Sequence, residues 1–256
     1  DYYYKLNENF NNGLQFAKEV LGDDFEKSGS TVSVQTQKIL NFSQELKRKL
    51  EAGSTPDEIS LMVVQELIAV PIRDVFATFD MQLQELADRT GKMVHPCFFA
   101  GENFTILPER YEGVMASLVH VARNIIDHAI DDPETRKQFG KFPKGEITIS
   151  TEKTDNGFTI IISDDGNGID TDVLRSKLVN KIDKTILDNM NDDEIIQHIF
   201  DDNISTRSEI SQISGRGVGM SAVKTEVEKL GGSVRVTSVI GEGTALHIAL
   251  PFILSL

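Results

Sequence analysis

The chain contains 256 residues, of which 39% are hydrophobic, so it can bury the core of one large domain or of two small ones. Its formal net charge of −14 argues against nucleic acid as the main partner. The single cysteine, Cys97, excludes an intramolecular disulfide and is typical of a reducing cytoplasm, where we expect the protein to act. No apolar run is long enough to predict a membrane span. Because the chain starts at Asp1 and not at a methionine, it is compatible with being the cytoplasmic part of a larger, membrane-associated protein.

Apolar residues recur with a helical period in three segments near the N-terminus, which predicts helices over residues 2–27, 34–51 and 56–68. Thr55 and Glu58 have the spacing of a capping box at the start of the third helix. The second and third helices would form an antiparallel hairpin, which usually buries its apolar side against a copy of itself. We therefore expect a homodimer through this region; the alternative is a hairpin that folds back on its own C-terminal domain. The apolar side of the second helix comprises Ile39, Phe42, Leu46 and Leu50.

Pro71 marks a boundary, and a second, mixed region begins there. Residues 171–214 are polar, with one or two short helices and few core positions, and we expect them to form a lid. The other helices of this region are expected at 75–88, 117–130 and 218–230. The strands are expected at 92–100 and 104–107, at 145–153 and 158–163, and at 233–239 and 244–251, each pair joined by a turn.

The helix predicted over 117–130 has two different faces. At about 100° per residue its apolar residues share one side, while the polar residues fall within an arc of about 140° on the other. An exposed helix face normally carries paired Glu and Lys. Two imidazoles, a carboxamide, a carboxylate and a guanidinium favour a binding site, although a solvated polar face remains the alternative. The polar residues are His120, Arg123, Asn124, Asp127 and His128.

Three glycine motifs follow this helix along the chain. Residues 164–168 read Asp-Asp-Gly-Asn-Gly at a predicted strand end, where a carboxylate can accept a hydrogen bond from an exocyclic amine. Residues 215–219 read Gly-Arg-Gly-Val-Gly before a helix, whose N-terminal N–H groups can hold phosphate. Residues 241–244 read Gly-Glu-Gly-Thr in the last hairpin. Each motif alone is weak, and plain turns are the alternative, but their order and context make a specific signal.

This order resembles the N, G1, G2 and G3 boxes of the ATP-binding domain shared by histidine kinases, Hsp90, type II topoisomerases and MutL. The likeness to chemotaxis-type histidine kinases is strongest, because HVARNIIDHAI resembles their HxxRNxxDHGI and SGRGVGM their G2 box. It implies an α+β fold, a two-layer α/β sandwich with a mixed sheet (the Bergerat or GHKL fold), over residues 71–256. Residues 1–70 would be the dimerisation region.

The resemblance also implies roles for particular residues. Asn124 would bind Mg²⁺, Asp164 would read the adenine amino group, and His120 would assist attack by a substrate imidazole on the γ-phosphate. The amides of Gly217 and Gly219 would hold phosphate, with Arg216, Lys224 and His128 nearby. The full set of implied ATP-binding residues is Arg123, Asn124, Asp127, His128, Asp164, Gly166, Gly168, Gly215, Arg216, Gly217, Gly219, Lys224 and Thr244.

The chain has five histidines, and none precedes His95, so the helical hairpin contains no phospho-acceptor histidine. The resemblance therefore implies an ATP-dependent histidine kinase core that phosphorylates a separate histidine-phosphotransfer domain, or another acceptor in trans, with a response regulator downstream. The family's lid motif FxPGFST survives only as Phe200 and a later Ser205-Thr206. That departure keeps a non-catalytic scaffold open as an alternative. An ATPase clamp is a third alternative, which His120 disfavours because hydrolysing relatives have a glutamate there.

Overall fold

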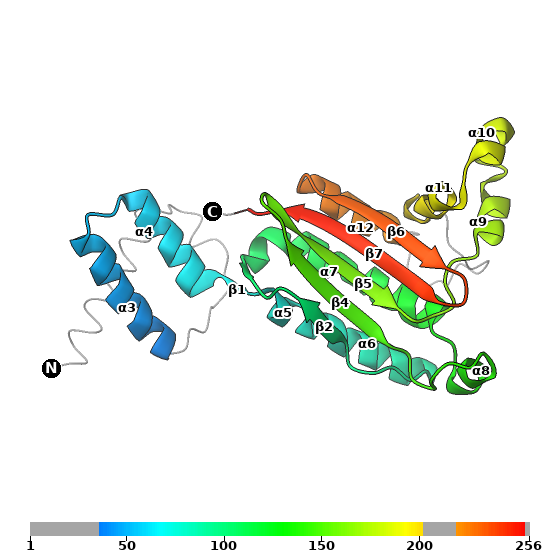
Figure 1. Ribbon diagram of the computed structural model, residues 1–256, viewed down its shortest axis with the longest axis horizontal. Coiled ribbons are helices and arrows are strands. Elements are labelled where there is room, and N and C mark those ends of the chain that lie inside the picture. The colour runs from blue at the N-terminus through cyan, green and yellow to red at the C-terminus, as the bar shows by residue number, and fades with distance from the viewer. Residues whose placement is uncertain (1–35, 202–218, 254–256) are drawn as a thin grey trace. The chain divides into compact units, whose positions relative to one another are not determined.

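The computed structural model describes residues 36–201 and 219–253 (Figure 1). The chain divides into two compact units. The first comprises residues 1–70, 105–107 and 253–256, and the second comprises residues 71–104 and 108–252. The helix predicted over 2–27 and the motif residues 215–217 lie outside the described residues. None of the described helices is both long and apolar enough to cross a membrane.

The first unit contains the predicted hairpin helices, α3 (Thr36–Glu51) and α4 (Pro56–Val63), the latter continued by a π-helix (Val64–Ile68). The capping box is confirmed: the Thr55 N–H donates to Glu58 Oε2 at 2.9 Å, and the Glu58 N–H donates to Thr55 Oγ1 at 3.3 Å. Leu50, which belongs to the apolar side of α3, is 57% exposed in the single chain. Dimerisation through this unit stays a prediction.

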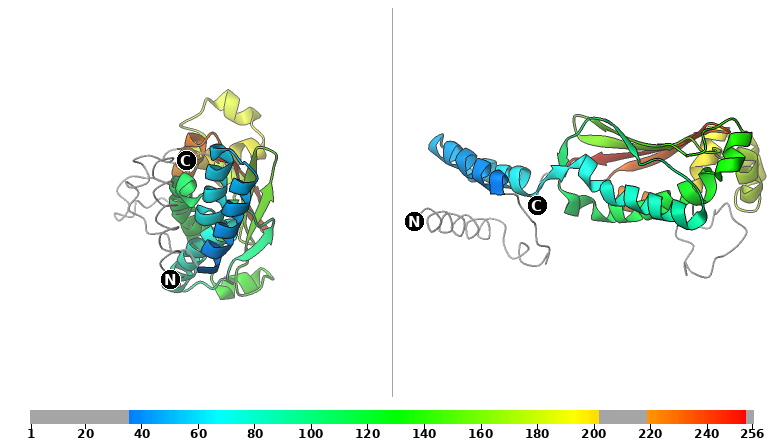
Figure 2. Two further views of the ribbon diagram at one scale, coloured as in Figure 1. Left: turned by 90° about the vertical axis from the view of Figure 1, so that its left-hand side faces the viewer. Right: turned by 90° about the horizontal axis from the view of Figure 1, so that it is seen from below.

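The second unit is built on a five-stranded mixed sheet in the order β2-β4-β5-β7-β6. Strand β2 runs parallel to β4, and the other neighbours are antiparallel. Helices α6, α7 and α12 lie against one face of the sheet, which gives the predicted two-layer α/β sandwich (Figure 2). The strands are β2 (Phe98–Gly101), β4 (Ile147–Lys153), β5 (Gly157–Asp164), β6 (Ser233–Val239) and β7 (Gly243–Pro251). The helices of this unit include α5 (Ile72–Val75), α6 (Ala77–Thr90), the 3-10 helix Pro108–Tyr111, α7 (Glu112–Asn124), α8 (Pro133–Gln138) and α12 (Met220–Lys229).

Side chains on the central strands alternate between buried and partly exposed, which is the pattern of a sheet with one covered face. The covered face is built mostly from β-branched and aromatic residues, which favour strands, together with leucines. Gly91, at φ 68°, ends α6, and Gly231, at φ 73°, follows α12. The buried residues of this face include Ile147, Ile149, Phe158, Ile160, Ile162, Leu246, Ile248 and Leu250.

One predicted strand pair is wrong. Residues 104–107 do not fold back on β2, which instead pairs in parallel with β4. Strand β3 (Thr105–Ile106) forms a two-stranded sheet with β1 (Val70–Pro71). The chain after β2 stays attached to β4, because the Glu102 N–H donates to the Thr151 carbonyl at 2.8 Å and Thr151 Oγ1 donates to the Glu102 carbonyl at 2.6 Å. The sequence Gly-Glu-Asn at residues 101–103 is compatible both with a hairpin turn and with the end of an edge strand.

Residues 171–200 hold more structure than their polar sequence predicts. They form α9 (Thr171–Leu178), α10 (Lys184–Asn189), α11 (Asp192–Gln197) and a 3-10 helix (His198–Phe200). Arg175 joins them by donating to the carbonyls of Leu187 at 2.6 Å and Met190 at 3.0 Å. Each helix contributes only one or two apolar residues, too few for a visible period, yet together they form a small hydrophobic cluster. Its buried members are Leu174, Leu178, Leu187 and Ile195.

Candidate functional site

The polar-faced helix is not regular over its whole length. It is an α-helix to Asn124 and a π-helix over Ile125–Ala129, closed by a hydrogen bond from the Ile130 N–H to the Ile125 carbonyl at 2.9 Å. The predicted arc, which assumed 100° per residue throughout, is therefore wrong beyond Asn124, because a π turn contains more residues. Lys92 stabilises the wider turn by donating its Nζ to the carbonyls of Ile126 and Asp127.

The exposures of the five polar residues still agree with a binding face. His120, Asn124 and Asp127 are half-buried, whereas Arg123 and His128 are exposed. Burial lowers the pKa of His120 below its usual 6.5, and the nearby Arg123 guanidinium lowers it further. The imidazole is therefore neutral at pH 7 and can accept a proton.

The loop after β5 is attached to the end of this helix. The Asn167 N–H donates to the Ala129 carbonyl at 2.9 Å, and its side-chain amide donates to Asp131 Oδ2 at 2.7 Å. A Cβ added at Gly166 would lie 2.4 Å from the Ala129 carbonyl oxygen, so only glycine permits this approach. The first glycine motif and the polar helix therefore meet at one place.

The final hairpin meets the same loop from the other side. Asp164, the last residue of β5, is paired with Thr244 of β7, and the Gly241 N–H donates to the Asn167 carbonyl at 2.8 Å. Gly168 has φ 73°, and a Cβ there would lie 2.3 Å from a carbonyl oxygen of the hairpin. The structure thus brings together the predicted site residues Asp164, Gly166, Gly168 and Thr244 with the end of the polar helix.

Asp164 is the most perturbed carboxyl group of this site. Burial raises its pKa from the usual 3.8 to about 6, although the N–H groups of Gly166 and Thr244 and the charge of Lys141 oppose the rise. The Gly166 N–H donates to Asp164 Oδ1 at 2.9 Å. A carboxylate whose burial is unfavourable gains strongly from a further hydrogen-bond donor, such as the exocyclic amine of a ligand.

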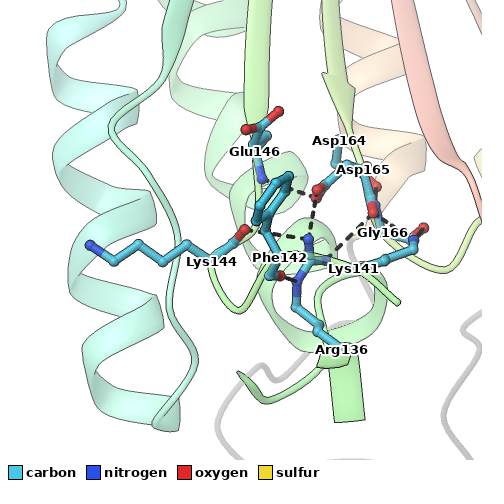
Figure 3. Close-up of polar contacts among 8 residues, drawn as sticks. All are labelled: Arg136, Lys141, Phe142, Lys144, Glu146, Asp164, Asp165 and Gly166. Carbon is cyan, nitrogen blue, oxygen red and sulfur yellow. Dashed lines mark hydrogen bonds and ion pairs between the residues drawn. The ribbon is translucent and has the colours of Figure 1, made fainter. Parts of the chain in front are cut away.

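Sequence reasoning missed the basic residues that hold this loop. Arg136 of α8 is 1% exposed, and its Nη2 contacts Asp165 Oδ2 at 2.6 Å (Figure 3). Lys141 Nζ donates to the carbonyls of Asp165 and Gly166. A signal for Lys141 was present, because residues 140–147 read GKFPKGEI and resemble the GKP-containing connection of chemotaxis-type histidine kinases. A buried arginine, however, cannot be recognised in a stretch whose other charges are exposed.

The predicted phosphate-binding residues Gly215, Arg216, Gly217, Gly219 and Lys224 belong to the second glycine motif or to α12, and the structure describes residues 36–201 and 219–253. Gly215, Arg216 and Gly217 lie outside those ranges. Gly219 immediately precedes α12 as its N-cap. Lys224 lies on α12 with its side chain 43% exposed and its Nζ 4.0 Å from Glu228.

The described residues do not form a complete metal-binding site by themselves. Over residues 36–201 and 219–253, no group of three or more His, Cys, Asp or Glu could hold an ion. Asn124 fits a Mg²⁺ site as a single oxygen donor, because its side chain is half-buried and does not cap the π turn that begins there. An ion at this position would take its other oxygens from phosphate and water.

Comparison with known proteins shows the family to which the chain belongs. The chain belongs to the histidine kinase-, DNA gyrase B- and HSP90-like ATPases, whose family model matches residues 113–254. It is 39% identical over 197 residues to the gliding motility regulatory protein of Myxococcus xanthus, and 34% identical over 193 residues to the chemotaxis protein CheA of Rhizobium meliloti. Each alignment covers 75% of this chain and 25% of the relative. The predicted likeness to chemotaxis-type histidine kinases is thereby confirmed.

Among solved structures, the chain is similar to the mycobacterial sensor histidine kinase MprB, with 20% identity and a TM-score of 0.44 over 72% of this chain and 97% of that one. The chain spans about a quarter of the length of the two relatives named above.

Proposed function

We propose that this chain is the ATP-dependent core of a protein-histidine kinase in a two-component system. It would transfer the γ-phosphoryl group of ATP to a histidine of a separate phosphotransfer domain, from which a response regulator would receive it. The observation that carries the proposal is the partly buried Asp164 at the junction of three segments, with its pKa raised to about 6. Membership of the ATPase family and likeness to CheA support it.

Asp164 would recognise the base. Its carboxylate would accept a hydrogen bond from the adenine amino group, while Gly166 and Gly168 let the main chain approach the flat ring. The end of the polar helix lies against this loop through the Asn167 N–H and the Ala129 carbonyl, 2.9 Å apart. The same helix would therefore run from the base toward the phosphates.

The phosphates would lie along α7 and the start of α12. Asn124 would contribute its carboxamide oxygen to Mg²⁺, which neutralises phosphate charge when bound. Arg123, Asp127, His128, Arg216 and Lys224 would face this end, with amides from residues 215–219. In this arrangement the protein mainly positions ATP, which is where most catalysis of phosphoryl transfer originates.

His120 would act on the incoming acceptor. An acceptor imidazole nitrogen attacks the γ-phosphorus, the bond from phosphorus to the bridging oxygen of ADP breaks, and the acceptor loses a proton. Because burial keeps His120 neutral at pH 7, it can take that proton and orient the attacking ring. A glutamate would suit water better, so hydrolysis is the less favoured reaction.

The experiment supplies purified histidine-phosphotransfer domain and γ-labelled ATP, and follows acid-labile phosphoprotein and free phosphate separately. We expect label on the added domain, and Gln in place of its acceptor histidine should abolish it. Free phosphate without phosphoprotein would favour an ATPase clamp. Failure to bind ATP at all would favour a non-catalytic scaffold. We also propose a homodimer through residues 1–70, so a chain without these residues should be monomeric.

A further inference from the structure

Arg136 is the largest fully buried side chain among the described residues, in a protein of strongly negative charge. A buried arginine is rare unless its donors are all used. Here Nε donates to the Phe142 carbonyl at 2.8 Å and Nη2 to Asp165 Oδ2 at 2.6 Å. Longer contacts reach the carbonyls of Lys144 at 3.4 Å and Asp165 at 3.5 Å. The guanidinium therefore connects the loop after α8 to Asp165 through hydrogen bonds.

Lys141, in that same loop, points toward the main chain of Asp165 and Gly166 (Figure 3). Its Nζ donates to the Asp165 carbonyl at 2.7 Å and to the Gly166 carbonyl at 2.6 Å. Both cations thus converge on two consecutive residues of the first glycine motif. Asp165 is held from a third direction, because the Glu146 N–H donates to Asp165 Oδ1 at 3.0 Å.

Gly166, which Lys141 contacts, is hydrogen-bonded to the Asp164 carboxylate. The Gly166 N–H donates to Asp164 Oδ1 at 2.9 Å, so rotation of the Gly166 peptide would turn the carboxylate. Lys141 donates to the carbonyl groups of Asp165 and Gly166, which precede and follow that N–H in the main chain. An apolar contact could stabilise the fold here, but it would not fix the orientation of a peptide plane as charged hydrogen bonds do.

We propose that Arg136 and Lys141 are positioning residues for base recognition: they hold the Asp165–Gly166 main chain so that the Asp164 carboxylate faces the amino group of the base. This inference rests on the proposed function, because it requires that Asp164 recognise the base. It assigns part of the discrimination between bases to residues that do not touch the nucleotide. The positive charge of Lys141 also opposes the rise in the pKa of Asp164, which keeps more of that carboxyl group ionised at neutral pH.

The test compares two nucleotides that differ only in the group to be read. ATP carries the 6-amino group, and purine riboside triphosphate lacks it. Calorimetry on the full chain should show that wild type prefers ATP. In Lys141→Met, which keeps the length of the side chain but removes its donors, that preference should fall about tenfold. The affinity for purine riboside triphosphate should stay within about twofold of wild type.

Lys137→Met is the matched control. Lys137 lies on α8, four residues before Lys141; its side chain is 53% exposed and pairs with Glu134 at 2.9 Å. It should keep the wild-type preference. Arg136→Lys keeps the charge but loses the fork of donors, so it should reduce the preference as Lys141→Met does.

The outcomes separate the two claims. A wild-type preference for ATP that persists in folded Lys141→Met would overturn the positioning role and leave the proposed function standing. Equal weakening of both nucleotides, together with a lower melting temperature, would show a purely structural role and would also overturn it. Binding of neither nucleotide by wild type would refute the proposed function itself.

Discussion

The partly buried carboxylate of Asp164 should lower the free energy of unfolding of the nucleotide-free domain. We expect Asp164→Asn to stabilise the nucleotide-free protein at pH 7.5. Replacing an ordinary pKa of 3.8 by about 6 means that ionised Asp164 destabilises the folded state by up to about 3 kcal/mol, at about 1.4 kcal/mol for each pKa unit. For a domain of this size that corresponds to a melting temperature higher by roughly 6–12 °C in the variant.

The effect has a definite pH dependence. A carboxyl group whose pKa is raised on folding destabilises the protein only where it is ionised. The destabilisation is absent below the unfolded pKa of 3.8 and complete above the folded pKa of about 6. The difference between variant and wild type should therefore be about 2 kcal/mol at pH 5.3 and about 3 kcal/mol at pH 7.5.

The assay is urea unfolding at both pH values, followed by circular dichroism. Asp165→Asn is the matched control, because the neighbouring carboxylate stabilises the fold through Arg136, which is 1% exposed. It should lower the free energy of unfolding by about 2 kcal/mol, less than for a fully buried pair, since Asp165 is 34% exposed. An Asp164→Asn protein that is less stable than wild type, or whose advantage does not grow with pH, would refute the reasoning.

Three further predictions follow from the same geometry. Asn124→Ala should abolish the Mg²⁺ dependence of ATP affinity with a melting temperature within about 2 °C of wild type, because the side chain lies on the binding face; calorimetry with and without Mg²⁺ checks this. His120→Gln should reduce phosphotransfer by about 10²–10⁴-fold while ATP affinity stays within about twofold, and wild-type phosphotransfer should fall as the pH drops below the lowered pKa of His120. Deleting residues 1–70 should give a monomer that still binds ATP; a dimer that persists in sedimentation would contradict the predicted interface.

The sequence predicted most of the sandwich, because its signals there are local. Alternating strands, the Asn156-Gly157 turn and the glycines that end α6 and follow α12 each depend on neighbouring residues only. The capping box at Thr55 is of the same kind. The family resemblance implied that Asp164 and Thr244 belong to one ATP site, and the structure pairs these two residues in neighbouring strands.

The features that sequence reasoning missed depend on contacts between distant residues. The π turn over Ile125–Ala129 is stabilised by Lys92, more than thirty residues earlier. The parallel pairing of β2 with β4 joins segments separated by the whole of α7. Arg136 is buried because Asp165 neutralises it, and no local pattern indicates that pair. Such contacts are set by the tertiary fold, which overrides the local propensity of each segment.

The most direct test of the nucleotide site is calorimetry of ATP and ADP with wild type and Asp164→Asn, each with and without Mg²⁺. The site described here predicts that wild type binds both nucleotides, that Mg²⁺ strengthens the binding, and that Asp164→Asn loses it although the variant is the more stable protein. Undetectable binding by wild type, or unchanged affinity in Asp164→Asn, would contradict the assignment of this cluster as an ATP site.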